Sequence, residues 1–507
     1  MAHHLLNRRE ALKGALAAVA ALPLSTSMLG NARAQATPPK FLFVVCASGG
    51  ADIRDAFLPL AASQAPATVR SRPDTDIRTV GGLRCIERVA PQRFYVGAGT
   101  VNGQNGPVQR NFLTRHGPDV AVLTATGTSV NHISAAKRWL NGAGLVNRGR
   151  TILEAHALAH ATPDMPIPAV NMAQGGYVSD GDDPTVPGYA RAETVANALL
   201  FGMATHPSRG MRPASRGARQ EALLARARAV REQMDDQSPF VVRHAGSRLL
   251  SEFRRNRREA VPLMDELDLI TQLTMVADGP GVPLAQYGLA ASQTQLDLLN
   301  SVGFGSLVTD PFMAQAALAY LLVKSGASCA VAIGAPPAPI PDAGYPGQSF
   351  TLRHTPIAYD FSHTDHEATQ LAMWDRTLTM TDGLIQLLKA TPLGTGTMWD
   401  RSLVYITTEF GRTVTKPAGN GSYGSGHELN NGVTVVSPLL VGNRVYGGVD
   451  AATGYTTGWD DTGATSTNPD HRRGEPHIIA TLGAALDHQL APTDAAYVQR
   501  AVIRGGA

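Results

Sequence analysis

The chain has 507 residues, of which 43% are hydrophobic and 17% charged, and its formal net charge is +3. The apolar content is too high for a disordered chain, and the length predicts one large α/β domain with insertions, or two domains. The small overall charge gives no support to a role in binding nucleic acid or a membrane surface.

The first 36 residues are predicted to be an export signal and not part of the fold. Arg8 and Arg9 precede a short Ala/Leu stretch, and "ARAQA" at residues 32–36 supplies the small residues of a cleavage site. The arginine pair resembles a twin-arginine signal, which predicts a periplasmic or secreted protein handled by the twin-arginine translocase; a plain Sec signal is the alternative. No later apolar run is long enough to span a bilayer, so no stable membrane insertion is expected.

Strands alternate with helices along the mature chain, residues 37–507. Continuous apolar runs at residues 41–47 and 120–125 each lead into a polar loop, as buried strands of parallel sheets do. Further on, a helix runs into a strand within residues 313–334, and a helix at 377–392 precedes a strand in 402–410. This alternation predicts a doubly wound, mostly parallel α/β sheet.

Residues at about 210–300 have a different character and are predicted to form a helical insertion. In residues 219–234, one helical face gathers the apolar side chains of Leu223, Leu224, Ala227, Val230 and Met234. Residues 249–273 form a similar, highly charged helical stretch, whose basic run at 254–258 is interpreted as a solvated helix face and not as a binding patch. The insertion is expected to be a cap or an interface.

Polar side chains follow the predicted strands, at the edge of the sheet where ligands of open parallel sheets bind. Each of them alone has an ordinary explanation, such as an Asx turn or a hydrogen-bonded histidine. In chain order they are Asp52; Thr128, Ser129, Asn131 and His132; Asp360, His363, Asp365, His366 and Glu367; Glu409 and Arg412; and His427.

The segment "DFSHTDHE" (residues 360–367) is the strongest indication of a metal site. Its two histidines and three carboxylates stand within eight residues, where they would repel one another unless they are solvated or gathered around a cation. Carboxylate and imidazole without thiolate suit Zn²⁺ or Mn²⁺. A pair of such ions can polarise a phosphoryl or sulfuryl oxygen and activate a nucleophile. A solvated loop is the alternative.

The order of "SGGAD", "SVNHISAAKRWL", "DFSHTDH", "TTEFGRT" and "GHELNNGVTVVSPLLVGNRVYGGVD" resembles an exported bacterial family catalogued as domain of unknown function 1501. This family is similar to the alkaline-phosphatase and sulfatase superfamily, and the resemblance covers residues 40 to 490, roughly. It implies a three-layer sandwich of alkaline-phosphatase type. It also implies two divalent metal ions, Zn or Mn, bound by an acid after the first strand, an Asp/His cluster, a strand-end acid and a final histidine.

Carried over residue by residue, the resemblance makes Asp52 the first acid, Asp360 and His363 the cluster, Glu409 the strand-end acid and His427 the final histidine. Arg412, which follows Glu409, would pair with a substrate oxyanion or with a neighbouring carboxylate.

The sequence departs from the family pattern at three places. Related sequences usually read Trp-Asp-Thr-His in the cluster, whereas this one reads "YDFSHTDH", so the ligand pair is either Asp360/His363 or Asp365/His366. Gly426 stands where an acid often precedes the final histidine. At the nucleophile loop, Asn131-His132 replaces the Ser-His of the family. One alternative is that Thr128 or Ser129 supplies the hydroxyl at the helix N-terminus, where the dipole favours an anion. The other is that the nucleophile is lost and the protein is a degenerate, non-catalytic member of the family.

The resemblance therefore implies an exported metal-dependent hydrolase or transferase that acts on a phosphate or sulfate ester of an anionic small molecule or polymer. Ser129 or Thr128, or a metal-bound hydroxide, would attack, Arg412 would neutralise developing charge, and His132 of the same loop completes the candidate catalytic set. The sulfatase signature Cys/Ser-x-Pro-x-Arg is not present. The alternative is a non-enzymatic periplasmic binding or scaffold protein on the same fold, and a protein that only stores or senses metal is a third possibility.

Overall fold

The structure is a computed structural model of the chain. It describes residues 38–88, 107–143, 145–173, 181–205, 218–258, 260, 263–264, 267–279, 284–285, 289–305, 307–308, 310–334, 338–341, 350–353, 358–418, 423–488 and 496–505. The predicted export signal at residues 1–36 lies outside these ranges. Within them, no helix combines the length and the apolar character needed to cross a membrane.

The main sheet has eight strands in the order β16-β4-β15-β12-β1-β7-β5-β6. β15 runs antiparallel to its neighbours β12 and β4, and the other pairs in the sheet are parallel. The prediction of a mixed α/β protein with a mostly parallel sheet is thus confirmed. The strands are β1 (Phe41–Cys46), β4 (Val120–Thr126), β5 (Ala169–Asn171), β6 (Glu193–Thr194), β7 (Ala330–Ile333), β12 (Ser402–Thr407), β15 (Asn430–Val436) and β16 (Arg444–Tyr446).

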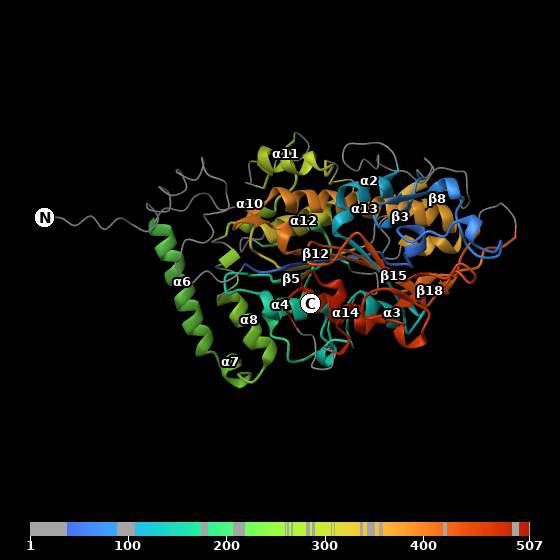
Figure 1. Ribbon diagram of the computed structural model, residues 1–507. Coiled ribbons are helices and arrows are strands. Elements are labelled where there is room, and N and C mark those ends of the chain that lie inside the picture. Colours follow the sequence, from blue (N-terminus) through green and yellow to red (C-terminus); the bar gives the residue numbers. More distant parts are fainter. Residues whose placement is uncertain are drawn as a thin grey trace.

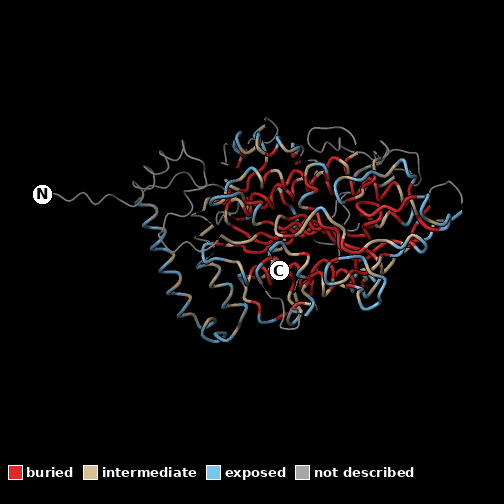
Figure 2. The backbone as a smooth tube through the Cα atoms, in the orientation of Figure 1, coloured by how far each residue is buried: buried red, intermediate tan, exposed pale blue. Residues whose placement is uncertain are grey.

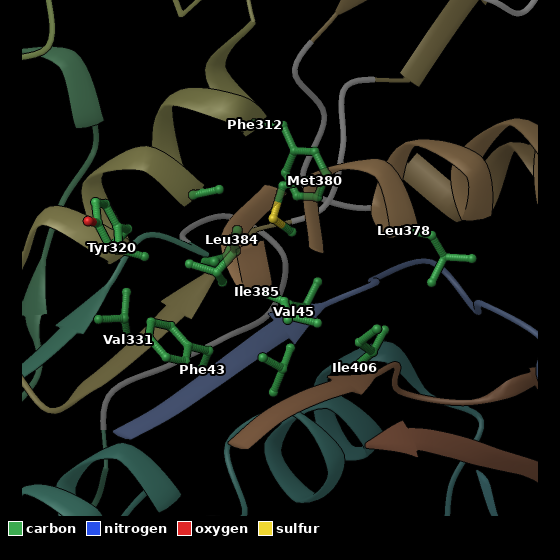
Figure 3. Packing of buried hydrophobic residues seen from close by; sticks show 14 of the residues in the cluster. Phe43, Val45, Phe312, Tyr320, Val331, Leu378, Met380, Leu384, Ile385 and Ile406 are labelled. Carbon is green, nitrogen blue, oxygen red and sulfur yellow. The ribbon is translucent and has the colours of Figure 1, made fainter. Parts of the chain in front are cut away.

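Helices cover both faces of this sheet, which lies between two helical layers (Figure 1). One layer contains α2 (Val108–His116), α12 (Pro311–Lys324) and α13 (His366–Ala390); the other contains α3 (His132–Trp139), α4 (Ile152–His160) and α14 (Glu475–Ala485). Because successive side chains of a strand point to opposite faces, β1 contributes to both cores. Phe43 and Val45 pack with residues of α12 and α13, as Figure 3 shows, whereas Leu42 and Val44 belong to the core on the other face. Burial on both faces explains why these strands read as continuous apolar runs.

Smaller elements surround the main sheet. The minor strands are β2 (Ile77–Val80), β3 (Leu83–Ile86), β8 (Ala338–Pro341), β9 (Phe350–Arg353), β10 (Pro392–Leu393), β11 (Gly396–Thr397), β13 (Gly411–Arg412), β14 (His427–Glu428), β17 (Gly448–Val449), β18 (Thr456–Trp459) and β19 (Thr465–Ser466). β13 and β14 pair antiparallel, with Arg412 opposite His427. This pairing joins two segments that the sequence separates by a loop.

The described residues between β6 and β7 form helices and no strand of the sheet. Besides α12, the α-helices here are α5 (Phe201–Ala204), α6 (Ala218–Asp236), α7 (Pro239–Arg243), α8 (Arg248–Arg258), α10 (Leu269–Leu273) and α11 (Gln293–Ser301). α6, α7 and α8 project from one end of the molecule (Figure 1), and most of their surface is exposed or half-buried (Figure 2).

Candidate metal centre

The candidate site lies where three strands end. β1, β4 and β12 run in the same direction, so the loops that follow Cys46, Thr126 and Thr407 meet at one edge of the sheet. The loop after β4 leads to His132 at the start of α3, and the loop after β12 carries Glu409. Two further segments complete the site: the 3₁₀ helix η10 (Ala358–His363) carries Asp360, and β14 begins with His427.

His132, Asp360 and His427 form a compact group of potential metal ligands. Their ligand atoms all lie within 4.8 Å of one another. Among the described residues, this is the group of three or more His, Cys, Asp or Glu side chains that could hold a metal ion. Asp360 Oδ1 is 3.7 Å from His132 Nε2 and 3.6 Å from His427 Nε2. All three side chains are half-buried. Two imidazole nitrogens and one carboxylate oxygen are a donor set that suits Zn²⁺ or Mn²⁺.

The contacts behind the two imidazoles orient their Nε2 atoms toward Asp360. His132 Nδ1 lies 2.9 Å from Glu409 Oε1, and His427 Nδ1 lies 3.0 Å from the carbonyl oxygen of Val130. Neither oxygen can donate a hydrogen bond, so each neutral ring carries its proton on Nδ1 and a lone pair on Nε2. This arrangement is the usual support of a metal-binding histidine. Phe410 packs against both rings, at centroid distances of 4.7 Å from His132 and 3.9 Å from His427.

Glu409 is fully buried directly behind His132. Its Oε1 accepts a hydrogen bond from the amide of Gly49 at 2.9 Å, in addition to the contact with His132, and its Oε2 accepts one from Thr408 Oγ1 at 3.1 Å. The family resemblance implied that Glu409 is itself a metal ligand. In the structure its carboxylate contacts the imidazole of His132 and is not one of the three residues of the group.

Asp360 also contacts Arg412, whose Nη2 lies 2.9 Å from Asp360 Oδ1. Burial opposes ionisation of Asp360, but the interactions with His427 and Arg412 outweigh it and lower the pKa of Asp360 to about 2. Arg412 is itself fully buried and donates to the carbonyl oxygens of Tyr359 and Ser425, both at 3.2 Å. It therefore pairs with a neighbouring carboxylate and holds together the segments that carry Asp360 and His427.

His363 lies beside the group, with its Nε2 3.0 Å from His427 Nε2 and 3.3 Å from Asp360 Oδ1. Its side chain is 45% exposed, so its ring is the least constrained of the histidines here. Burial and the nearby charge of Arg412 lower its pKa below the ordinary value. At neutral pH the ring is therefore uncharged and able to serve as a further nitrogen donor.

Asp52, the predicted first acid, is engaged by arginines. Its Oδ2 lies 2.5 Å from Nη2 of both Arg54 and Arg70, and its Oδ1 accepts from the backbone and side chain of Arg54. Asp52 also accepts a hydrogen bond from the amide of Arg412 at 3.0 Å. Burial would raise the pKa of Asp52, but Arg54 and Arg70 outweigh this effect and lower it. The carboxylate thus has cationic partners without a metal ion.

Asp365 and His366 have structural contacts of their own. Asp365 caps α13 by accepting from the amide of Ala368 at 3.2 Å, so the helix begins at His366, well before the predicted residue 377. His366 is fully buried, with Nε2 3.0 Å from Asp55 Oδ2 and Nδ1 2.7 Å from Ser425 Oγ. Burial and Arg70 lower its pKa to about 4. Of the two alternative pairs, the structure brings Asp360 and His363 to the group.

The candidate nucleophiles lie in the loop between β4 and α3. Thr128 is exposed, and both its amide and its hydroxyl donate to Glu475 Oε1, at 2.8 and 2.9 Å. Ser129 Oγ accepts from the amide of Asn131 at 3.0 Å, while the side chain of Asn131 caps α3. This cap is the local reason that His132 takes the first position of the helix.

Sequence reasoning did not identify Val130, Phe410 or Glu475 as parts of this region. Phe410 stands between the predicted Glu409 and Arg412, so its position in "TEFGR" was a usable signal. The carbonyl of Val130 has no sequence signal, because every residue has a backbone carbonyl oxygen. Only the conformation of the backbone directs this oxygen at His427. Glu475 begins α14, far from Thr128 in sequence, and only the fold brings the two together.

No protein-family model, curated protein or solved structure matches the chain. The fold and the site define a class: a mixed α/β protein with a candidate His/Asp/His metal centre at the carboxyl edge of its sheet.

Proposed function

We propose that this protein is an exported metal-dependent hydrolase or transferase, acting on a phosphate or sulfate ester, with a sandwich fold of alkaline-phosphatase type. The observation that carries the proposal is the group of His132, Asp360 and His427, in which both imidazoles present Nε2 lone pairs to one carboxylate oxygen. The position of this group at the carboxyl edge of a mostly parallel sheet supports the same reading, because substrates of such folds bind there.

The donor set supports one divalent ion, Zn²⁺ or Mn²⁺, held by His132, Asp360 and His427, with His363 as the fourth ligand. When bound, such an ion acts as a Lewis acid on the ester oxygens of the substrate. The contacts of Asp52 with Arg54 and Arg70 count against a second ion at that position. Arg412, being buried, acts by fixing Asp360 and not by touching the substrate.

Thr128 is the favoured nucleophile, because its hydroxyl already donates to a carboxylate that can accept the proton. The distance of 2.9 Å between Thr128 Oγ1 and Glu475 Oε1 is that of a nucleophile and its general base. In this scheme the Thr128 oxygen attacks the phosphorus or sulfur atom, its proton passes to Glu475, and the ester oxygen leaves. Water, or another acceptor hydroxyl, then takes the group from Thr128. Ser129 is the other candidate hydroxyl.

The proposal is tested by metal content and turnover measured on the same preparations. Untagged protein is supplemented with Zn²⁺ or Mn²⁺, analysed by elemental mass spectrometry, and assayed against phosphate and sulfate esters. We expect one equivalent of ion, lost together with turnover in His427→Ala. His471→Ala is the matched control, since the Nδ1 of His471 contacts Ser466 Oγ outside the group. Protein that binds neither ion after supplementation would refute the hydrolase.

One observation favours the second candidate, a non-enzymatic binding or scaffold protein. Around Asp52, the buried carboxylates Asp52 and Asp55 are neutralised by Arg54, Arg70 and Arg72. Protein side chains thus supply the positive charge that the resemblance assigned to a metal ion. A scaffold would retain its fold and show no turnover with or without added ions, and His427→Ala would change neither.

A further inference from the structure

The helices α6, α7 and α8 expose an unusual amount of apolar surface. Among the described residues, fourteen large apolar side chains are exposed, and seven of them lie on these three helices. They are Leu223, Val230 and Met234 on α6, Phe240 and Val242 on α7, and Leu249 and Phe253 on α8, with exposed fractions from 47% to 80%. Exposed apolar surface on this scale marks an interaction site.

On α6 the apolar residues form one stripe. Leu223, Ala227, Val230 and Met234 are spaced by four, three and four residues, which places them on one face of the helix. Together with flanking Arg226, Arg231 and Asp235 they line a shallow depression on the surface. The stripe is therefore an amphipathic face with arginines along its border.

The same segment concentrates positive charge. Residues 218–258 contain ten arginines, no lysine and five acidic residues, which gives a formal charge of +5, whereas the whole chain carries only +3. Three of the acidic residues are paired with arginines of α8: Glu232 with Arg257 and Arg258, Asp235 with Arg257, and Asp236 with Arg254 and Arg258. These pairs link α6 to α8 and leave the arginines in surplus.

The charges argue against a second copy of the chain as the partner. Both copies would carry the formal charge of +5 on residues 218–258, so the two surfaces would repel each other. A parallel pair of α6 helices in register would also bring Arg226 of one copy against Arg231 of the other, because these two residues flank the stripe on opposite sides. Like charges at such positions disfavour the pairing. The chemistry that fits is an apolar layer bordered by anions.

We propose that α6, α7 and α8 dock on the surface of an anionic phospholipid bilayer. The exposed apolar side chains enter the boundary between headgroups and acyl chains, and the arginines contact lipid phosphates, which their planar guanidinium groups bind through paired hydrogen bonds. The three helices project from one end of the molecule (Figure 1). This docking is independent of the proposed chemistry at His132, Asp360 and His427.

Co-sedimentation of the full chain with vesicles tests the proposal. Vesicles contain equal parts phosphatidylglycerol and phosphatidylcholine, or phosphatidylcholine alone, at low and high salt. We expect binding to the anionic vesicles only, weakened by salt. Arg226→Gln and Arg231→Gln should each reduce the partition coefficient about fivefold. Residues 1–37 are present in every variant, so differences between variants report on the helices.

Two valines of similar exposure give a matched control for the apolar contribution. Val242 on α7 is 64% exposed and Val308, outside the three helices, is 68% exposed. Val242→Ser should weaken binding to anionic vesicles, and Phe240→Ser combined with Val242→Ser should weaken it further, whereas Val308→Ser should not. The proposal is overturned if the helix variants bind like the parent, or if vesicles are not bound at all. It is also overturned if light scattering shows a dimer that the helix variants disrupt, because the surface would then serve a second copy.

Discussion

Replacing Glu409 tests whether the buried carboxylate prepares His132 to bind a metal ion. Two of the three contacts of the carboxylate are made by Oε1, which lies 2.9 Å from His132 Nδ1 and 2.9 Å from the amide of Gly49. Glu409→Gln keeps an oxygen at this position, so both hydrogen bonds persist but lose the negative charge. Glu409→Ala removes both acceptors and leaves the amide of Gly49 unpaired in a buried position.

The two variants should therefore form a graded series. Loss of a partner behind a ligating histidine costs about 10- to 100-fold in metal affinity. We expect about tenfold for Glu409→Gln, which corresponds to about 1.4 kcal/mol, and about 100-fold for Glu409→Ala. The affinity for Zn²⁺ is measured by competition with a chelating dye after the protein has been stripped of metal, and the unfolding free energy of each variant is measured in urea.

A second buried carboxylate–histidine pair supplies the control. Asp382 Oδ1 lies 2.8 Å from His116 Nε2, both side chains are buried, and the pair joins α13 to α2 away from the candidate centre. Asp382→Asn should destabilise the fold without changing the affinity for Zn²⁺. The reasoning is refuted if Glu409→Gln binds Zn²⁺ like the parent, or if Asp382→Asn weakens binding as much as Glu409→Gln does.

Two further predictions concern the framework of the site, and a third concerns a buried histidine elsewhere in the fold. Gly424→Ala should abolish metal binding, because an added Cβ would overlap the backbone carbonyl of His363. Gly117→Ala is the control and should leave metal binding unchanged, because its Cβ meets nothing within 4 Å. Calorimetric titration with the metal ion compares the two variants. Arg412→Met should lower the unfolding free energy by about 3 kcal/mol or more, measured in urea, because it leaves the Asp360 carboxylate without its buried cation; a smaller loss would contradict this role. Burial lowers the pKa of His488 from the ordinary 6.5 to about 3. Between pH 6.5 and pH 3, therefore, the unfolded chain binds a proton at His488 and the folded chain does not. The free energy of unfolding should fall by about 1.4 kcal/mol for each unit by which the pH decreases in this range. His488→Gln should show a shallower pH dependence of the urea midpoint, and an unchanged slope would refute the assignment.

The sequence by itself determined several strands of the sheet. The apolar runs at residues 41–47 and 120–125 predicted strands, and β1 and β4 occupy them within one residue. This signal is local, because a strand buried on both faces must be apolar at every position. The same reasoning placed His132, Glu409 and His427 near strand ends. It could not foresee that β15 runs antiparallel between β4 and β12, since pairing direction is a property of two distant segments.

The tertiary structure decided which polar residues meet. Asp52 and Asp360 both read as acids near the sheet edge, yet the fold surrounds Asp52 with Arg54 and Arg70 and leaves Asp360 beside three histidines. Arg70 stands in a loop whose sequence gives no sign of this contact. The partner of a buried charge is set by packing between segments far apart in the chain, and each such charge needs a partner because its desolvation is costly. Sequence therefore supplied the candidate ligands, and packing selected among them.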